Sequence, residues 1–120
     1  FLGALSDEEV RDHYRRCRAL IFADEEDFGI VPLEAQACGS PVIAYAKGGA
    51  LETTIQQETA IWFHEQTPEA IIAAVQEFEK QSFAVTAIRN HACRFAKKRF
   101  KQEMQIYIEQ KMADYENFRF

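Results

Sequence analysis

The sequence predicts an α/β fold in which an open parallel sheet carries helices on both faces. Three short apolar runs, Leu20–Ala23, Pro41–Tyr45 and Ala60–Phe63, are too brief for helices and fit buried strands. Segments with helix-start signals or helical spacing alternate with these runs, and such alternation builds parallel βαβ units. A length of 120 residues favours one domain.

Local signals place the first helices. Ser6-Asp-Glu-Glu9 is a capping-box pattern, so we expect a helix from Asp7 to Arg18. Pro32 suits the first position of a second helix, which Gly39 can end in a left-handed conformation. Residues 50–55 can form one or two helical turns after the second strand.

The remainder of the chain is predicted to be helical. Thr67, Pro68 and Glu69 supply a cap, a first-turn proline and an acidic first turn, so a helix follows to about Lys80. Beyond it, apolar residues recur at helical spacing. Two consecutive helices are therefore expected over about residues 82–116.

Charge and cysteine usage narrow the classes of partner. The chain has 14 basic and 19 acidic residues and a net charge of -5, so its field repels phosphate backbones and we expect no nucleic-acid partner. Cys17, Cys38 and Cys93 lie far apart and are odd in number, with no CxxC motif and no Cys/His cluster. That spacing is typical of reduced thiols and indicates neither a metal site nor a disulfide framework.

Further sequence features concern the location of the protein in the cell and whether the chain is part of a larger protein. No apolar run approaches the roughly 20 residues that span a bilayer, so we expect a soluble, cytoplasmic protein. The basic run from Arg89 to Lys101 has two interpretations, a contact with the anionic inner face of the membrane or a solvated helix face. The start, Phe1-Leu-Gly3, resembles the end of a buried strand, so we expect the chain to be the back portion of a larger protein.

Two loops fall at the carboxyl edge of the predicted sheet, where open α/β sheets bind ligands. The first is EDFGIVPLE, from Glu26 to Glu34, and the second is KGGALE, from Lys47 to Glu52. Gly29 lets the backbone approach a ligand, and the helix that follows directs free amides toward the strand ends. The first loop therefore outlines an anion site.

The acidic side chains extend that site. Glu34, expected in the first helical turn, can accept two hydrogen bonds from the vicinal diol of a ribose. A phosphate on the amides and a sugar on Glu34 together describe a nucleotide, and Glu26 would reach past the phosphates toward the group they carry. Each loop alone also fits plain structure, namely a solvated acidic turn with turn glycines, and a Glu52 that caps its own helix. The three histidines, His13, His64 and His91, are interpreted as surface or helix-face residues.

The combined motif resembles a known family. Between Glu26 and Glu52 the sequence contains three motifs in order: E-x7-E with F-G inside it, A-x-A-x-G-x-P-V-I, and G-G-x-x-E. This order resembles the donor-binding half of the family-four, or group 1, retaining glycosyltransferases of GT-B fold. FLG-x-x-S-D-E-E before this string and R-N-H-A-x-R-F-A-K-K-R-F after it also resemble the family. The likeness thus covers nearly the whole chain and implies that residues 1–120 are a partial Rossmann-like, carboxy-terminal donor domain, helices 82–116 included.

The resemblance implies a role for each loop residue. Glu34 would hold the ribose hydroxyls of a nucleotide diphosphate sugar, and the amides of Gly29, Ile30 and Val31 would lie along the diphosphate. Glu26 would be the catalytic residue, contacting hydroxyls of the transferred sugar and orienting its anomeric carbon.

Three further residues complete the donor-binding set that the resemblance implies, Phe28, Gly48 and Gly49. The two glycines would allow the backbone to approach the donor closely. Departures from the family pattern also exist. Gln56 to Ala60 lacks the glycines of the family's Gly-x-Thr-Gly turn, and the chain lacks the basic pair that clamps the diphosphate.

The implied activity is transfer of a hexose, with retention, from a nucleotide diphosphate sugar to a glycan or lipid-linked acceptor, without cofactor or metal. The sequence looks most like O-antigen mannosyltransferases of polysaccharide biosynthesis, which favours mannose and GDP-mannose. An amino-terminal acceptor domain would be the missing partner, so we expect the isolated fragment to be inactive. The alternative is a truncated, non-catalytic α/β module that binds nucleotide or serves as a scaffold.

Overall fold

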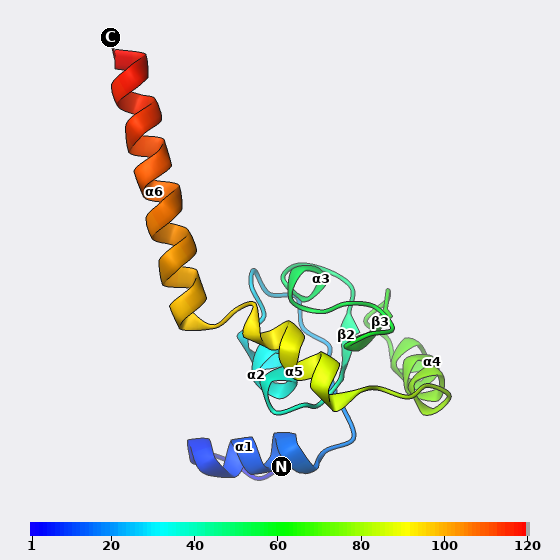
Figure 1. Cartoon of the computed structure of the whole chain (residues 1–120). Helices are drawn as coiled ribbons and strands as arrows, with labels where there is room; N and C mark the ends of the chain where they lie inside the picture. Colours follow the sequence, from blue (N-terminus) through cyan, green and yellow to red (C-terminus); the bar gives the residue numbers. More distant parts are fainter. Residues whose placement is uncertain (120) are drawn as a thin grey trace.

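The computed structural model describes residues 1–119 and has the alternating order that the sequence predicts (Figure 1). Its elements are α1 (Asp7–Arg16), β1 (Leu20–Phe22), α2 (Ile30–Ala37), β2 (Val42–Tyr45), α3 (Ala50–Thr53), β3 (Ala60–Phe63), α4 (Pro68–Glu79), α5 (Val85–Cys93) and α6 (Lys97–Arg119).

The three strands form one parallel sheet in the order β1-β2-β3. Leu20 pairs with Val42, and Val42 pairs with Ala60, so the carboxyl ends of all three strands lie at one edge. The central strand β2 is buried throughout, as expected for a strand covered on both faces. The predicted parallel α/β architecture is confirmed.

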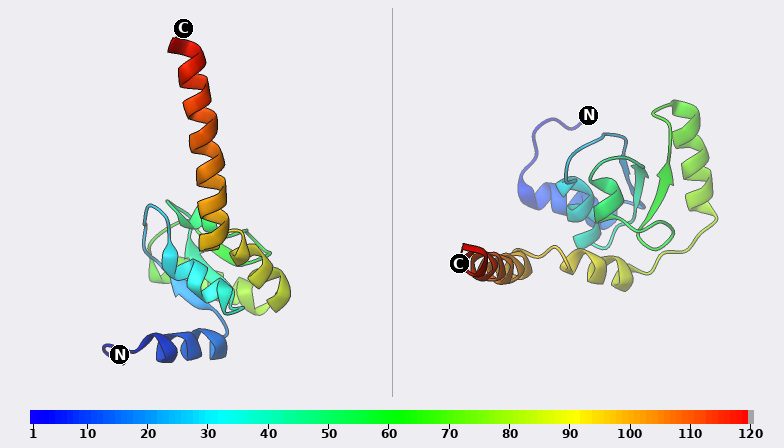
Figure 2. Two further views of the ribbon diagram at one scale, coloured as in Figure 1. Left: turned by 60° about the vertical axis from the view of Figure 1, so that its left-hand side comes forward. Right: turned by 90° about the horizontal axis from the view of Figure 1, so that it is seen from above.

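Helices cover both faces of the sheet (Figure 2). On one face, α2 contributes Ala35 to a buried cluster with Phe22, Val42, Ala44 and others from the strands and α3, and α5 packs on the outside of α2. On the other face, α4 packs against β2 and β3 and contributes Ala74 to a second cluster. The prediction of helices on both sides is therefore correct.

The first strand departs from the prediction that it is buried on both faces. Ile21 is 51% exposed because β1 is the edge strand of the described sheet and α4 packs on β2 and β3 instead. The segment Phe1–Gly3 was predicted to end a buried strand, and this is wrong. It pairs with no strand among the described residues, and Phe1 and Leu2 are exposed.

Helix α1 begins with the predicted capping box. The Ser6 hydroxyl accepts a hydrogen bond from the Glu9 amide at 3.2 Å, and the Ser6 amide donates to Glu9 Oε2 at 2.7 Å. The backbone bond from Ser6, followed by its hydroxyl bond, lowers the pKa of Glu9 from the ordinary 4.5. The helix ends at Arg16, two residues earlier than predicted, where Cys17 adopts an extended backbone.

Helix α2 begins at Ile30, two residues before the predicted start at Pro32. Gly29 is its N-cap, with a left-handed φ of 87°. Proline fits the third helical position because the first amides of a helix donate no intrahelical hydrogen bond. One consequence is a correction: Glu34 lies in the second helical turn and not in the first. Gly39 ends the helix in a left-handed conformation, as predicted.

The later helices agree with the sequence analysis. The Thr67 hydroxyl caps α4 by accepting from the Ala70 amide at 3.2 Å. Two helices then close the chain, and the second, α6, projects away from the sheet (Figures 1 and 2). Its apolar residues, Phe100, Met104 and Tyr107 among them, are largely exposed. Among the described residues, no helix combines the length and apolar character needed to cross a membrane.

Candidate donor-binding site

The two loops lie side by side, because they follow neighbouring parallel strands. One connects β1 to α2 and the other connects β2 to α3. The Gly49 amide donates to the Glu26 carbonyl oxygen at 2.5 Å, which joins the loops by their backbones. The predicted site residues of both loops are therefore brought to one edge of the sheet.

The glycine pair is explained by this loop contact. A methyl group on Gly49 would lie 2.2 Å from the Phe28 carbonyl carbon, and one on Gly48 would lie 2.4 Å from the Glu26 carbonyl oxygen. Gly48 also has a left-handed φ of 65°. In the structure, the backbone of the first loop fills the space beside both glycines.

The start of α2 presents unpaired backbone donors. Gly29 is the N-cap, and Ile30 and Val31 are the first two helical residues. Among residues 1–119, the amides of these three residues donate no hydrogen bond, since no helical carbonyl precedes them. An eight-residue helix with three free amides at its amino terminus, beside strand ends, suits an anion.

Glu34 lies one turn farther along α2, and Tyr14 of α1 contacts it. The Tyr14 hydroxyl donates to Glu34 Oε2 at 3.4 Å. Burial and then the negative charge of Glu34 raise the pKa of Tyr14, so the phenol keeps its proton and remains a donor. Sequence reasoning missed Tyr14, although its place four residues after Val10 put both on one face of α1.

A cavity of about 520 Å³ between α2 and α5 brings together Phe28, Ile30 and Glu34. Leu33 and Phe95 also line it, so its wall is mostly apolar. The side chain of Glu26 is exposed on the preceding loop, and neither it nor the two loop glycines line this cavity. The structure thus separates the predicted residues into a helix-side group and a loop-side group.

His91 agrees with one of the two predicted interpretations. It lies on helix α5 as a helix-face residue, and with only 8% of it exposed it is not a surface residue. Its Nε2 atom lies 2.9 Å from the Thr53 carbonyl oxygen, which is at the end of α3. The helical spacing of α5 could have indicated an inward residue at this position, because Ile88, three residues earlier, is fully buried.

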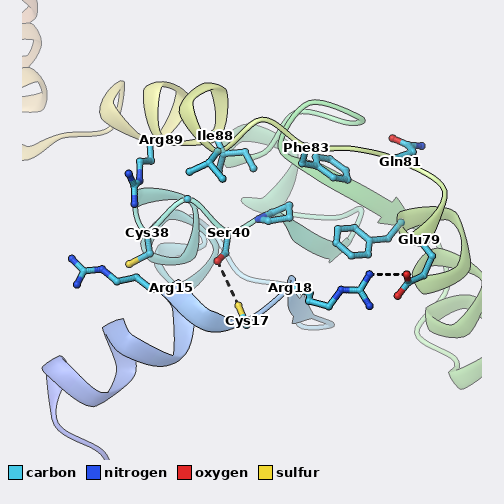
Figure 3. Close-up of a pocket in the computed structure, with 14 residues that line it drawn as sticks. Arg15, Cys17, Arg18, Cys38, Ser40, Glu79, Gln81, Phe83, Ile88 and Arg89 are labelled. Atoms are coloured by element: carbon cyan, nitrogen blue, oxygen red, sulfur yellow. Dashed lines mark hydrogen bonds and ion pairs between the residues drawn. The ribbon is translucent and has the colours of Figure 1, made fainter.

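A second cavity, of about 480 Å³, lies at the opposite edge of the sheet (Figure 3). Arg15, Arg18 and Arg89 line it, and Arg18 is paired with Glu79 at 2.7 Å. The residues that precede β1 and β2 form part of its wall, and no predicted site residue does. The carboxyl edge is therefore the better candidate for the donor.

The sequence matches a known family along most of its length. The profile described as Glycosyl transferases group 1 matches residues 1–100. The chain belongs to this glycosyltransferase family. A D-inositol 3-phosphate glycosyltransferase of Geodermatophilus obscurus is 32% identical over 98 residues, which are 80% of this chain and 22% of that relative. The present chain thus spans about a fifth of the length of the Geodermatophilus relative.

Two further comparisons concern substrate and fold. The alpha-1,3/1,6-mannosyltransferase ALG2 of Dictyostelium discoideum is 40% identical over 60 residues, 49% of this chain and 14% of that protein. The solved sucrose-phosphate synthase of Thermosynechococcus elongatus superposes with a TM-score of 0.66 at 27% identity, covering 94% of this chain and 30% of that one. The parallel sheet with its helices therefore matches a GT-B glycosyltransferase domain, as the sequence predicted.

The contact between the loops predicts that Gly49→Ala lowers the free energy of unfolding. Gly49 has a φ of -63°, which alanine adopts easily, so the change would ordinarily stabilise a protein by about 0.4–1 kcal/mol. Here the added methyl group meets backbone that cannot yield, and we expect a loss of about 1–3 kcal/mol in the free energy of unfolding. Urea denaturation measures it. Stabilisation by Gly49→Ala would show that the loops are not in contact.

Proposed function

We propose that this chain is the donor-binding part, over residues 1–120, of a retaining glycosyltransferase that moves a hexose from a nucleotide diphosphate sugar to a glycan or lipid-linked acceptor. The observation that carries the proposal is the row of free amides at Gly29, Ile30 and Val31, one helical turn before Glu34. A turn rises about 5.4 Å, so the two features are a short distance apart. Membership of the glycosyltransferase family supports this interpretation.

Each part of the site has a task in this proposal. The three amides bind the diphosphate, and Glu34 accepts hydrogen bonds from the ribose hydroxyls, with Tyr14 holding one carboxylate oxygen. The exposed Glu26 contacts hydroxyls of the transferred sugar and orients its anomeric carbon. Gly48 lets the second loop approach the first, which fixes the backbone of Glu26.

The chemistry follows from the amides. When the glycosidic bond to the donor phosphate breaks, negative charge develops on the leaving diphosphate. Donors that are already oriented toward this charge stabilise it without reorganisation. Attack on the same face of the sugar, with the leaving phosphate helping to deprotonate the acceptor, gives retention, and no covalent nucleophile is assigned. The acceptor would be bound by an amino-terminal domain supplied from outside this chain.

Mannose is the favoured sugar, with GDP-mannose as donor. The motif strings resemble O-antigen mannosyltransferases, and one relative is named as a mannosyltransferase. Other relatives are named as D-inositol 3-phosphate glycosyltransferases, and that name does not specify mannose. Titration of GDP, UDP and ADP tests which base the site prefers.

A non-catalytic nucleotide-binding or scaffold module is the second candidate. One observation favours it for this chain: the Nζ atom of Lys47, the cation of the second loop, lies 5.9 Å from the centroid of the Tyr45 ring, within range of a cation–π contact. A diphosphate clamp would then have to come from cations other than Lys47. The module would bind nucleotide without transferring sugar.

The nucleotide panel is the first test. Isothermal titration of GDP, UDP and ADP into the protein should give saturable binding with one base preferred, because the amides recognise the diphosphate and the base adds selectivity. GDP preference supports the mannosyl donor. Absence of heat with all three at millimolar concentration would count against the proposed site.

The two glutamates should separate binding from turnover in the complete transferase. Glu34→Ala removes two charge-assisted hydrogen bonds to the ribose, each worth about 1.5–3 kcal/mol, so the donor KM should rise at least about tenfold. Glu26→Ala should chiefly lower kcat. Glu65→Ala, a change of an exposed acid that follows β3 at the same edge and lies outside the motif, is the control and should alter neither by more than about twofold. A Glu26→Ala enzyme with unchanged kcat would contradict the assigned role.

A peripheral contact with the inner face of the membrane is also proposed, for a cytoplasmic enzyme acting on a lipid-linked acceptor. It rests on the exposed Arg94, Lys97 and Lys98, near the exposed Phe100. Sedimentation with phosphatidylglycerol vesicles should pull down the protein at low salt and release it as salt screens the charges, whereas phosphatidylcholine vesicles should not bind. Lys97→Glu with Lys98→Glu should abolish sedimentation. Equal binding to both vesicle types would overturn the contact.

A further inference from the structure

Three buried polar side chains lie beneath the two donor loops, and we call them the Thr53 cluster. Thr53 ends α3, Gln36 lies on α2, and His91 lies on α5. Thr53 and Gln36 have 0% exposure and His91 has 8%. Buried polar groups are costly unless they are hydrogen-bonded, so the bonds of this cluster show what holds the region in place.

The Thr53 carbonyl is the centre of the cluster. It accepts one hydrogen bond from Gln36 Nε2 at 3.0 Å and a second from His91 Nε2 at 2.9 Å. A carbonyl oxygen has two lone pairs, so both are used. The other amide hydrogen of Gln36 goes to the Pro32 carbonyl at 2.9 Å. Helices α2 and α5 therefore hold the end of α3 from two directions.

The cluster is connected directly to the loops. The Thr53 hydroxyl donates to the Gly49 carbonyl oxygen at 3.0 Å, and the Gly49 amide donates to Glu26 in the first loop. A methyl group on Gly29 would lie 3.4 Å from the Thr53 hydroxyl oxygen. A displacement of Thr53 would therefore shift both the second loop and the N-cap of α2.

His91 reaches the two loops by different contacts. Because a carbonyl cannot donate, His91 Nε2 must carry the proton of the bond to Thr53. Its ring packs edge-to-face on the Phe95 ring, with 5.6 Å between the ring centroids. Phe95 packs in the same way on Phe28 of the first loop, with 6.1 Å between the centroids. His91 on α5 thus contacts the end of α3 by a hydrogen bond, and Phe95, two residues after α5, contacts the first loop by aromatic packing.

We propose that His91 is a positioning residue that fixes the second donor loop relative to the first by donating its Nε2 proton to the Thr53 carbonyl. The inference rests on the proposed function, since the consequence for activity requires that these loops bind the donor. The sequence motifs of the loops do not include His91, and the contact spans 38 positions.

A matched pair of variants tests the role. His91→Gln carries an amide N–H at nearly the position of Nε2, whereas His91→Asn ends at the position of Nδ1 and leaves the Thr53 carbonyl one donor short. Backbone hydrogen exchange of the complete protein without nucleotide should be about tenfold faster at residues 49–54 in the asparagine variant, and within about threefold of wild type in the glutamine variant. The same pair at the exposed His13 is the control and should change neither.

Donor binding is measured on the same proteins. The asparagine variant should bind GDP about tenfold more weakly, and the glutamine variant should keep most of the affinity. Equal behaviour of the two variants, or unchanged exchange at residues 49–54 in the asparagine variant, would overturn the positioning role. Faster exchange spread evenly over β2 and α4 would also overturn it, because it would indicate general destabilisation.

A measurement on the wild-type protein covers the case in which a variant does not fold. Long-range proton–nitrogen spectra should show the Nε2–H form of His91, and the Nδ1–H tautomer would overturn the proposal. The proposed function and the positioning role of His91 can be contradicted independently. If the wild type binds no nucleotide while exchange responds as expected, the proposed function fails and the tie between the loops stands. If nucleotide binds and exchange does not respond, the reverse holds.

Discussion

The backbone contact between the two edge loops is the constraint on which the rest of the site depends. Gly49 approaches Phe28 so closely that a methyl group has no room, and its amide bonds the Glu26 carbonyl. Parallel pairing of β1 with β2 brings the loops to this edge, but glycine is what lets them touch. The free amides at the start of α2 and the backbone of Glu26 are consequently held at the same edge of the sheet. The site is therefore built by packing of main chain, with few side-chain contacts above it.

The sequence predicts the fold well because its signals are local. Apolar runs, the Ser6 capping box and the Thr67 cap each act within a few residues, and the structure confirms them. The start of α2 was misplaced because proline is favoured at the first helical position, whereas Gly29 had the left-handed conformation that begins the helix earlier. That error moved Glu34 by two helical positions, from the first turn into the second. The order of residues in the motif was right, and only its register on the helix was wrong.

The unpredicted features all depend on contacts between distant segments. Tyr14 meets Glu34 from α1, and His91 meets Thr53 from α5, 38 positions away. Helical periodicity indicates that a residue faces inward, but it does not identify the group that the residue meets. Local pattern therefore predicts candidate ligand-contacting groups, and the groups that hold them in place can be found only from the packed structure.

The charge of the first loop affects how the proposed site would bind an anion. The loop before Gly29 carries four consecutive acids, from Asp24 to Asp27, and all are exposed. A diphosphate that approaches this edge of the sheet is repelled by the four acids, and physiological salt screens that repulsion beyond a distance of about 8 Å. The free amides attract the diphosphate only within hydrogen-bond distance. Their dipoles offset the repulsion only at contact. We infer that strong donor binding also requires cations near the acidic loop. Arg89 lines the cavity that contains Glu34, and Arg94 and Lys97 line another cavity that includes Phe28. The acidic loop would then disfavour loosely held phosphates and retain those whose sugar hydroxyls meet Glu26 and Glu34, so the same carboxylates that weaken general anion binding would make it selective.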